Sequence, residues 1–224
     1  MTIGILLQGP ISPWTEKIIT YYAKTFPNAE ILLSTWDSEN IPKNLPCEFI
    51  LVTPPPMADN HYSTVNHQIV GTCAGLEYMD SDIIMKCRTD QFIRNTKIFE
   101  VFEKFCPRSK IMIPDYLTLD SIDYFASDLC QIATKDVLNH YWNSIKLYDG
   151  TFHLHHPEIF LTVNYIIRGK SDTNPWKECL RKYFYVKRFY EDFQIEWEKM
   201  DDPMKPDYKK YFSYFYPQLV KPDP

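Results

Sequence analysis

The charged residues at the end of the apolar run Asp82–Cys87 are the first candidates for chemistry. Lys86, Arg88 and Asp90 alternate along the chain, so their side chains share one side while the backbone stays extended. Lysine and arginine can neutralise a diphosphate, and an aspartate can bind a divalent cation through oxygen. A sugar transfer that releases a nucleoside diphosphate needs such charges beside the leaving group. The pattern therefore predicts a diphosphate site, with an Arg88–Asp90 salt bridge as the structural alternative.

Polar and aromatic residues also occur where two earlier apolar segments end. Gln8 and Gly9 close the first segment, and Trp36 and Asp37 close the second. Parallel α/β sheets bind ligands beyond the carboxyl ends of their strands. Gln8 can hydrogen-bond a base or ribose, Gly9 lets the backbone approach a ligand, Trp36 can stack and Asp37 suits ribose hydroxyls. The alternatives are an ordinary strand exit and a core tryptophan beside a capping aspartate.

Two amides lie near the start of a predicted helix at residues 64–79. Asn66 and Gln68 would lie in its first turn, where the partial positive charge of the helix terminus favours a pyrophosphate or sugar contact. A solvated first turn is the alternative. We predict that both residues contribute to the same nucleotide-sugar site.

The second half of the chain holds the candidate acid–base and metal residues. Asp128 precedes an apolar run and is a candidate general base, or else a turn residue. Glu158 follows Pro157 at a predicted helix start and can deprotonate an acceptor hydroxyl. His155 and His156 can complete a cation site with Asp90, or can belong to a polar surface loop.

These residues need a sheet to bring them together, and the hydrophobic pattern predicts one. Short apolar segments alternate with segments of helical periodicity, which predicts a mostly parallel, Rossmann-type α/β sheet flanked by helices on both faces. The predicted strands are 3–8, 30–35, 48–52, 82–87 and 110–113, and the predicted helices are 14–26, 64–79 and 95–105. A strand region at 125–134 and helices at 135–144 and 158–168 follow.

Composition excludes several classes of protein. The net charge of −5 provides no basic footprint for nucleic acid. The six glycines form neither a dinucleotide-binding motif nor a P-loop, and no nucleophile elbow occurs. The six cysteines show no Cys-x-x-Cys pair, and we find neither a signal peptide nor a run long enough to span a membrane. We therefore expect a reduced, cytoplasmic protein.

The last part of the chain differs from the rest. Residues 171–224 are rich in aromatic and charged residues, and we predict a helical extension packed on a domain formed by residues 1–170. The basic-aromatic segment 181–193 can contact a membrane surface peripherally. Packing of this segment on the sheet or on a second copy of the chain is the alternative.

Six short segments together resemble the WavE family, whose members belong to bacterial lipopolysaccharide and capsule synthesis and are similar to GT-A glycosyltransferases. The segments are Ile5-Leu-Leu-Gln-Gly-Pro-Ile, Leu33-Ser-Thr-Trp-Asp, Asn66-x-Gln68, Met85-Lys-Cys-Arg-Thr-Asp90, Ser127-Asp128 and Pro157-Glu158. The resemblance runs from about residue 3 to residue 165. It implies a GT-A-like fold and glycosyl transfer from a nucleotide-sugar donor to a glycan or glycolipid acceptor.

The resemblance also implies a divalent cation, Mn²⁺ or Mg²⁺, because GT-A enzymes usually carry Asp-x-Asp. Here Arg88 stands at the first position and Asp90 at the second, so part of the cation's charge can come from Arg88. Two other functions remain open: a nucleotidyltransferase, and a non-catalytic sugar-nucleotide binder or assembly subunit of a glycan-synthesis complex.

Overall fold

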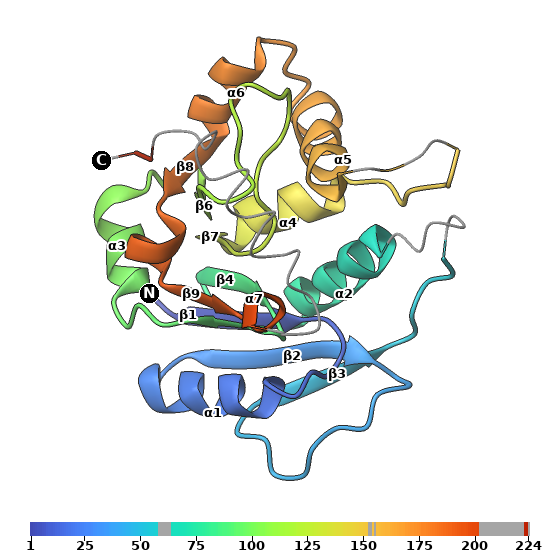
Figure 1. The fold of residues 1–224 in the computed structure, drawn as a ribbon, viewed down its shortest axis with the longest axis vertical. Coiled ribbons are helices and arrows are strands. Elements are labelled where there is room, and N and C mark those ends of the chain that lie inside the picture. The colour runs from blue at the N-terminus through green and yellow to red at the C-terminus, as the bar shows by residue number, and fades with distance from the viewer. Residues whose placement is uncertain (58–63, 152–153, 155, 202–221, 224) are drawn as a thin grey trace.

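A seven-stranded sheet forms the centre of the molecule (Figure 1). The structure is a computed structural model that describes residues 1–57, 64–151, 154, 156–201 and 222–223. The strand order is β3-β2-β1-β4-β7-β6-β8. The strands are β1 (Ile3–Gln8), β2 (Glu30–Trp36), β3 (Glu48–Val52), β4 (Ile83–Arg88), β6 (Ile111–Pro114), β7 (Gln131–Thr134) and β8 (Phe184–Lys187).

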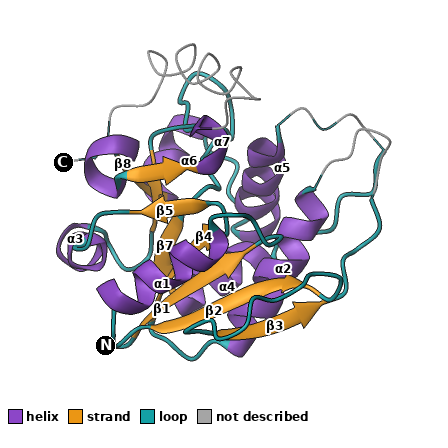
Figure 2. Ribbon diagram, turned by 60° about the horizontal axis from the view of Figure 1, so that its bottom comes forward, coloured by secondary structure: helices purple, strands orange, loops and turns teal. Residues whose placement is uncertain are grey.

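The first four strands are parallel, so their carboxyl ends meet at one edge (Figure 2). Strand β1 lies between β2 and β4, and its last residue, Gln8, pairs with both Ser34 and Arg88. Strand β7 is antiparallel to β4 and β6, whereas β8 is parallel to β6. The mostly parallel sheet predicted from the sequence is confirmed. Its order reverses at β1, which is where ligands bind in open α/β sheets.

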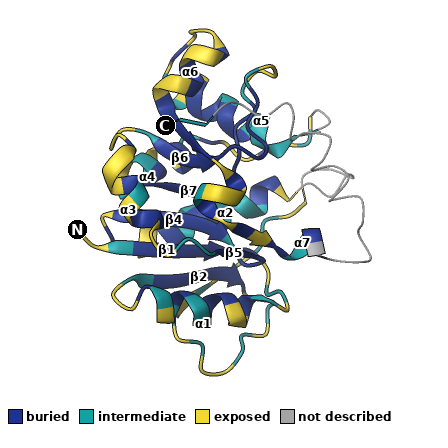
Figure 3. Cartoon of the chain, turned by 60° about the vertical axis from the view of Figure 1, so that its left-hand side comes forward, coloured by how far each residue is buried: buried dark blue, intermediate teal, exposed yellow. Residues whose placement is uncertain are grey.

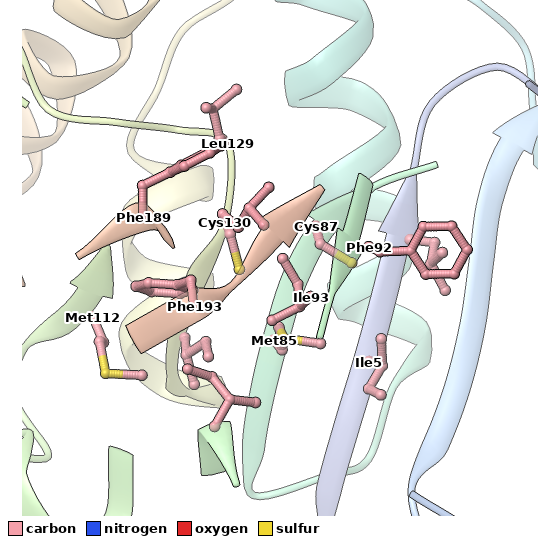
Figure 4. Close-up of a cluster of buried hydrophobic side chains, with 14 of the residues drawn as sticks. Ile5, Met85, Cys87, Phe92, Ile93, Met112, Leu129, Cys130, Phe189 and Phe193 are labelled. Atoms are coloured by element: carbon pink, nitrogen blue, oxygen red, sulfur yellow. The ribbon is translucent and has the colours of Figure 1, made fainter. Parts of the chain in front are cut away.

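Alternate residues of the central strands face two separate cores. Ile5 of β1 and Met85 of β4 belong to one core, and Leu6 and Ile84 belong to the other. Figure 4 shows part of the first core, in which Ile5, Met85 and Cys87 lie close to Phe92 and Ile93. A strand buried on both faces must be apolar at nearly every position, which explains the continuous apolar runs in the sequence.

Helices cover both faces of the sheet, as predicted. The first core is closed by α1 (Thr15–Thr25) and α3 (Ile98–Phe105). The second core is closed by α2 (Val65–Tyr78), α4 (Lys135–Asn143), α5 (Pro157–Val163), the π-helix η1 (Asn164–Gly169) and α6 (Trp176–Tyr183). The central strands are buried, and the exposed residues of α1 and α6 face outward (Figure 3).

The predicted strand region at 125–134 is a strand only over β7. Its first half is buried, but its backbone bonds to the preceding loop: the Leu119 amide donates to the Phe125 carbonyl, and the Ser127 amide donates to Thr118 Oγ1. Burial without a sheet partner therefore explains the apolar pattern of residues 125–130.

The tail predicted to be helical also contains strands. After α6, strand β8 joins the main sheet, and a second strand, β9 (Ile195–Trp197), pairs antiparallel with β5 (Gln91–Ile93). The π-helix η2 (Phe189–Phe193) connects β8 with β9, and α7 (Glu198–Asp201) follows. The described part of the tail is thus helical only over α6, the short α7 and η2, and one of its strands, β8, belongs to the seven-stranded sheet.

The basic-aromatic segment 181–193 lies within this part of the tail, so its surroundings can be compared with the two predicted alternatives. Tyr183, Phe184, Tyr185 and Phe189 are buried in the two cores, and Tyr190 is exposed. The segment therefore packs on the sheet, which is the alternative stated above, and it presents no continuous apolar face outward. Among the described residues, no helix is both long enough and apolar enough to cross a membrane.

Candidate functional site

A cavity of about 290 Å³ opens at the carboxyl ends of β1, β2 and β4. It lies at the reversal of strand order, where the fold favours a ligand. Five of the predicted site residues reach it from the strand ends, and a sixth comes from the first turn of α2. These six are Gln8, Gly9, Trp36, Arg88, Asp90 and Gln68. The cavity is also lined by Pro10, Ser12, Thr64, His67, Thr89 and Lys199.

The loops after β1 and β4 are fastened to each other beside this cavity. Thr89 Oγ1 donates to the Pro10 carbonyl at 2.7 Å, and Thr15 Oγ1 donates to the Thr89 carbonyl at 3.0 Å. Gly9 has φ +138°, and a Cβ there would lie 2.9 Å from Thr89 Oγ1. The close approach of the two loops therefore requires a glycine at position 9, whether or not a ligand also approaches its backbone.

One wall of the cavity is suited to a flat, polar ligand. Trp36 is buried at the end of β2, and its ring lies 5.1 Å from the His67 ring, edge to face. The Gln8 amide donates to the His67 carbonyl at 3.4 Å, a long bond that fixes the side chain beside the cavity. Burial lowers the pKa of His67, whose buried Nδ1 has no hydrogen-bond partner among the described residues. An aromatic surface beside amides can hold a base or a sugar ring.

Other residues of the cavity lining carry charge. Arg88 Nε and Nη2 donate to the two carboxylate oxygens of Asp90 at 2.8 and 2.9 Å, so the pair is bidentate. Trp197 Nε1 donates to Asp90 Oδ2 at 3.2 Å. Burial alone would raise the pKa of Asp90, but Arg88, Lys199 and Trp197 outweigh it and hold that pKa below its usual range. The Arg88–Asp90 salt bridge, given above as the structural alternative to a diphosphate site, is thus present, and both residues line the cavity.

A second charged group lies next to Arg88, outside the cavity lining. Lys86 is fully buried. Its Nζ donates to the Asp128 carbonyl at 3.1 Å and lies 4.9 Å from the centre of the Trp142 ring. Burial lowers the pKa of Lys86 to about 8. Burial, together with the Asp128 carboxylate, raises the pKa of Glu158 to about 8, and Arg88 partly opposes this rise. The negative charge of Asp128 thus disfavours ionisation of Glu158, whereas the positive charge of Arg88 favours it.

Besides Lys86, two more of the predicted nucleotide-binding residues do not line the cavity. The Asn66 amide is used within the protein: it donates to the Tyr148 carbonyl at 2.8 Å and accepts from the Tyr148 amide at 2.7 Å. This pair of bonds ties α2 to the loop that follows α4. Asp37 is exposed and accepts from Thr53 Oγ1 at 2.8 Å. Neither residue lines the cavity.

The described residues do not fit a divalent cation at Asp90. Both Asp90 oxygens are held by Arg88, whose positive charge opposes a second cation at the same carboxylate. His156 precedes α5 and its ring lies 5.1 Å from that of Phe125. In the part of the chain that the structure describes, no three His, Cys, Asp or Glu residues gather as metal ligands. The remaining predicted ligand, His155, lies outside the described residues.

Among the residues at the site that were not predicted from the sequence, two come from distant parts of the chain. Trp197 and Lys199 come from β9 and α7, and the pairing of β9 with β5 brings them to Asp90. No local pattern marks them, because a tryptophan and a lysine beside acidic residues are common in a solvated tail. Their position at the site depends on a long-range contact, the hydrogen bond from Trp197 to Asp90 across about a hundred residues of chain.

Three solved structures are similar to this chain at low sequence identity. The 4-diphosphocytidyl-2C-methyl-D-erythritol synthase of Anaerococcus prevotii has a TM-score of 0.53 and 10% identity, with coverage of 93% of this chain and 98% of that chain. The HddC structure of Yersinia pseudotuberculosis has a TM-score of 0.48, 11% identity and coverage of 96% and 100%. TarS 1–349 of S. aureus has a TM-score of 0.45, 12% identity and coverage of 74% and 56%.

The similarity to the Anaerococcus prevotii synthase concerns the fold alone. Together with the observed sheet and its helices on both faces, it confirms the predicted GT-A-like α/β class. A comparison with curated protein sequences gives no match. The family model described as "WavE lipopolysaccharide synthesis" matches residues 3–162, which is more than half of the chain and includes β1 to α5. The chain belongs to the WavE lipopolysaccharide synthesis family.

Proposed function

We propose that this protein is a glycosyltransferase that moves a sugar from a nucleotide-sugar donor to a lipopolysaccharide, lipooligosaccharide or capsule glycan. The observation that carries the proposal is the cavity at the carboxyl ends of β1, β2 and β4, which is lined by aromatic and amide side chains and by cationic ones. A nucleotide sugar has the matching parts: a flat base, a polar ribose and a diphosphate. Family membership supports a place in glycan synthesis.

Each wall has its own task in this proposal. Trp36, Gln8 and Gln68 hold the nucleoside or the sugar, and Gly9 lets the backbone approach it. Arg88 lies beside the diphosphate, where its charge offsets the negative charge that develops on the leaving group. Asp90 orients Arg88 through the bidentate bond, so that the guanidinium stays in place before the donor binds.

Glu158 is the candidate base. In an inverting transfer the acceptor oxygen attacks the anomeric carbon, the bond to the diphosphate breaks, and the acceptor proton moves to a carboxylate. A base is most effective when its pKa lies near the working pH, and the raised pKa of Glu158, about 8, meets this condition. Asp128 supports it by keeping that pKa high. The rate of transfer should therefore rise with pH up to about 8.

The test combines binding and turnover. A thermal-shift screen of UDP-, GDP-, CMP- and dTDP-sugars names the donor class, since a ligand of the folded state raises the melting temperature. Transfer is then measured as release of the free nucleotide in the presence of an acceptor glycan. We expect Glu158→Gln to keep the thermal shift but lose turnover, by roughly a hundredfold or more. Lys177→Gln is the control, because Lys177 is exposed and pairs only with Asp120 in the described structure.

Other outcomes identify the other two functions. A nucleotidyltransferase would release pyrophosphate from a nucleoside triphosphate and a sugar phosphate. A non-catalytic binder would show the thermal shift without turnover, and Glu158→Gln would leave it unaltered in both assays. Either result would contradict the proposed glycosyl transfer.

A further inference from the structure

The described C-terminal residues complete the charged wall of the cavity. The family model ends at residue 162, whereas β9 and α7 lie beyond it. Trp197 pairs with Gln91 across the β5–β9 ribbon, and the Glu198 amide donates to the Asp90 carbonyl at 3.0 Å. Figure 1 shows β9 and α7 in front of β1 and β4. Trp197 and Glu198, the two residues before Lys199, are thus held next to Asp90 and Gln91 by backbone pairing.

Two side chains of this segment act on the Arg88–Asp90 pair. The Trp197 ring lies 5.5 Å from the Arg88 guanidinium, and its Nε1 donates to Asp90. Lys199 is half-buried, lines the cavity together with Arg88, and its Nζ lies 5.5 Å from the Trp197 ring. Among the described residues that line the cavity, Arg88 and Lys199 are cationic and Asp90 is a carboxylate, which Arg88 pairs through both oxygens.

This charge balance suits an anion. Arg88 and Asp90 together are close to neutral, and Lys199 adds a positive charge to the described lining of the cavity. A cation on Asp90 would have to compete with a guanidinium that holds both oxygens at 2.8 and 2.9 Å. A diphosphate, in contrast, can accept from the Lys199 ammonium and the Arg88 guanidinium, which both line the cavity.

We infer that Arg88 and Lys199 bind the donor diphosphate directly, in place of a divalent cation on Asp90, and that the segment β9–α7 supplies the second charge. The inference rests on the proposed function and specifies how its site holds the diphosphate. Trp197 is a positioning residue, because it holds Arg88 and Asp90 in place and supports the stem of Lys199. The ligand class is a nucleoside diphosphate, alone or as a nucleotide sugar.

The test is a calorimetric titration of UDP, GDP, CDP, ADP and dTDP, and of the matching monophosphates, in EDTA and then in Mn²⁺. We expect at least one diphosphate to bind in EDTA, with an affinity within about twofold of that in Mn²⁺. Lys199→Gln should weaken that diphosphate roughly tenfold or more, because a charge-assisted hydrogen bond to the second phosphate is lost. The matching monophosphate should change by about twofold at most, and Lys199→Arg should retain most of the affinity.

Lys177→Gln serves as the control for loss of one positive charge, and near-ultraviolet circular dichroism confirms that each variant is folded. The inference is overturned if no diphosphate binds in EDTA, or if Lys199→Gln binds diphosphates as tightly as the wild type. The outcome is separable from that of the proposed function. Diphosphate binding in EDTA without sugar transfer would refute only the proposed function, whereas sugar transfer that requires Mn²⁺ would refute only this inference.

Discussion

At the scale of single residues, the Arg88–Asp90 pair is the most heavily constrained interaction of the site. Arg88 approaches both oxygens, Trp197 holds one of them, and Asp90 is buried while Arg88 is partly exposed. A carboxylate in such a place loses solvation and regains it from fixed partners. Removing its charge therefore has a larger effect than breaking a similar pair at the surface.

We expect Asp90→Asn to lower the free energy of unfolding by about 2–3 kcal/mol at pH 7. The control is Glu196→Gln, which breaks the neighbouring surface pair with Arg94 by the same change of chemistry and should cost below about 1 kcal/mol. Urea unfolding measures both. Because the pKa of Asp90 is lowered on folding, its stabilisation is present above about pH 4 and is lost as the pH falls through the folded-state pKa. Equal costs for the two variants at pH 7 would contradict this account.

Glu158 should have the opposite dependence on pH. Its pKa rises from an ordinary 4.5 to about 8 on folding, so between these values the folded state binds more protons than the unfolded state. Stability should therefore fall as the pH rises from about 5 to 8. We expect Glu158→Gln to be more stable than the wild type by about 1–3 kcal/mol at pH 8, a value reduced from the full linkage because solvent reaches part of the residue. Parallel unfolding curves for the two proteins at every pH would disprove the raised pKa.

At the scale of elements, the close approach of α2 to β1 shapes the cavity. A Cβ on Gly75 would lie 2.4 Å from Leu6 Cδ1, and Leu6 is fully buried. A Cβ on Gly71 would lie 2.9 Å from Gln8 Nε2 and 3.2 Å from Trp36 Cη2, both beside the cavity. Gly75 of α2 therefore packs against a buried leucine of the core, whereas Gly71 packs against two side chains that line the cavity.

The two glycines should respond differently to the same substitution. Alanine gains about 1 kcal/mol of helix propensity at either position. At Gly75 overpacking against Leu6 should exceed this gain and leave a net loss of about 1–2 kcal/mol in urea unfolding. At Gly71 the end of the Gln8 side chain can move, so we expect near-normal stability but weaker nucleotide binding. A Gly71→Ala protein with unaltered affinity in the thermal-shift screen would show that Gln8 has no part in the site.

The elements that the sequence predicts correctly are those with a strong local signal. Strands β1, β2, β3 and β4 are apolar runs that end in turn residues, and parallel strands end at one edge, which is enough to bring Gln8, Trp36 and Arg88 together. Strands β5, β8 and β9 escape prediction because each has only three or four residues, and their pairing joins distant parts of the chain. Lys199 could not be predicted for the same reason, because it follows β9 and is far along the chain from the other site residues. The bonds of Asn66 to Tyr148 are equally long-range, so the sequence does not distinguish this amide from those beside the cavity.

At the scale of the whole molecule, the C-terminal residues belong to the sheet and to both cores. Strand β8 pairs with β6, the side chains of Phe189 and Phe193 belong to the first core, and Trp176 and Phe184 belong to the second (Figure 4 shows Phe189 and Phe193). The Asp115 carboxylate accepts from the Phe189 amide at 2.8 Å, which fastens the loop after β6 to the segment after β8. These contacts bear on the predicted division of the chain at residue 170.

A fragment of residues 1–170 should not fold on its own. It would leave the edge of β6 unpaired and would expose the surfaces of both cores that the aromatic residues of the tail now cover, so collapse without fixed packing is the expected state. We expect the fragment to aggregate, or to show far-ultraviolet but little near-ultraviolet circular dichroism, while the full chain unfolds in one urea transition. A soluble fragment with a cooperative transition would establish residues 1–170 as an independent domain. In that event Lys199 would belong to a separate unit, and its delivery to the diphosphate would depend on how that unit docks.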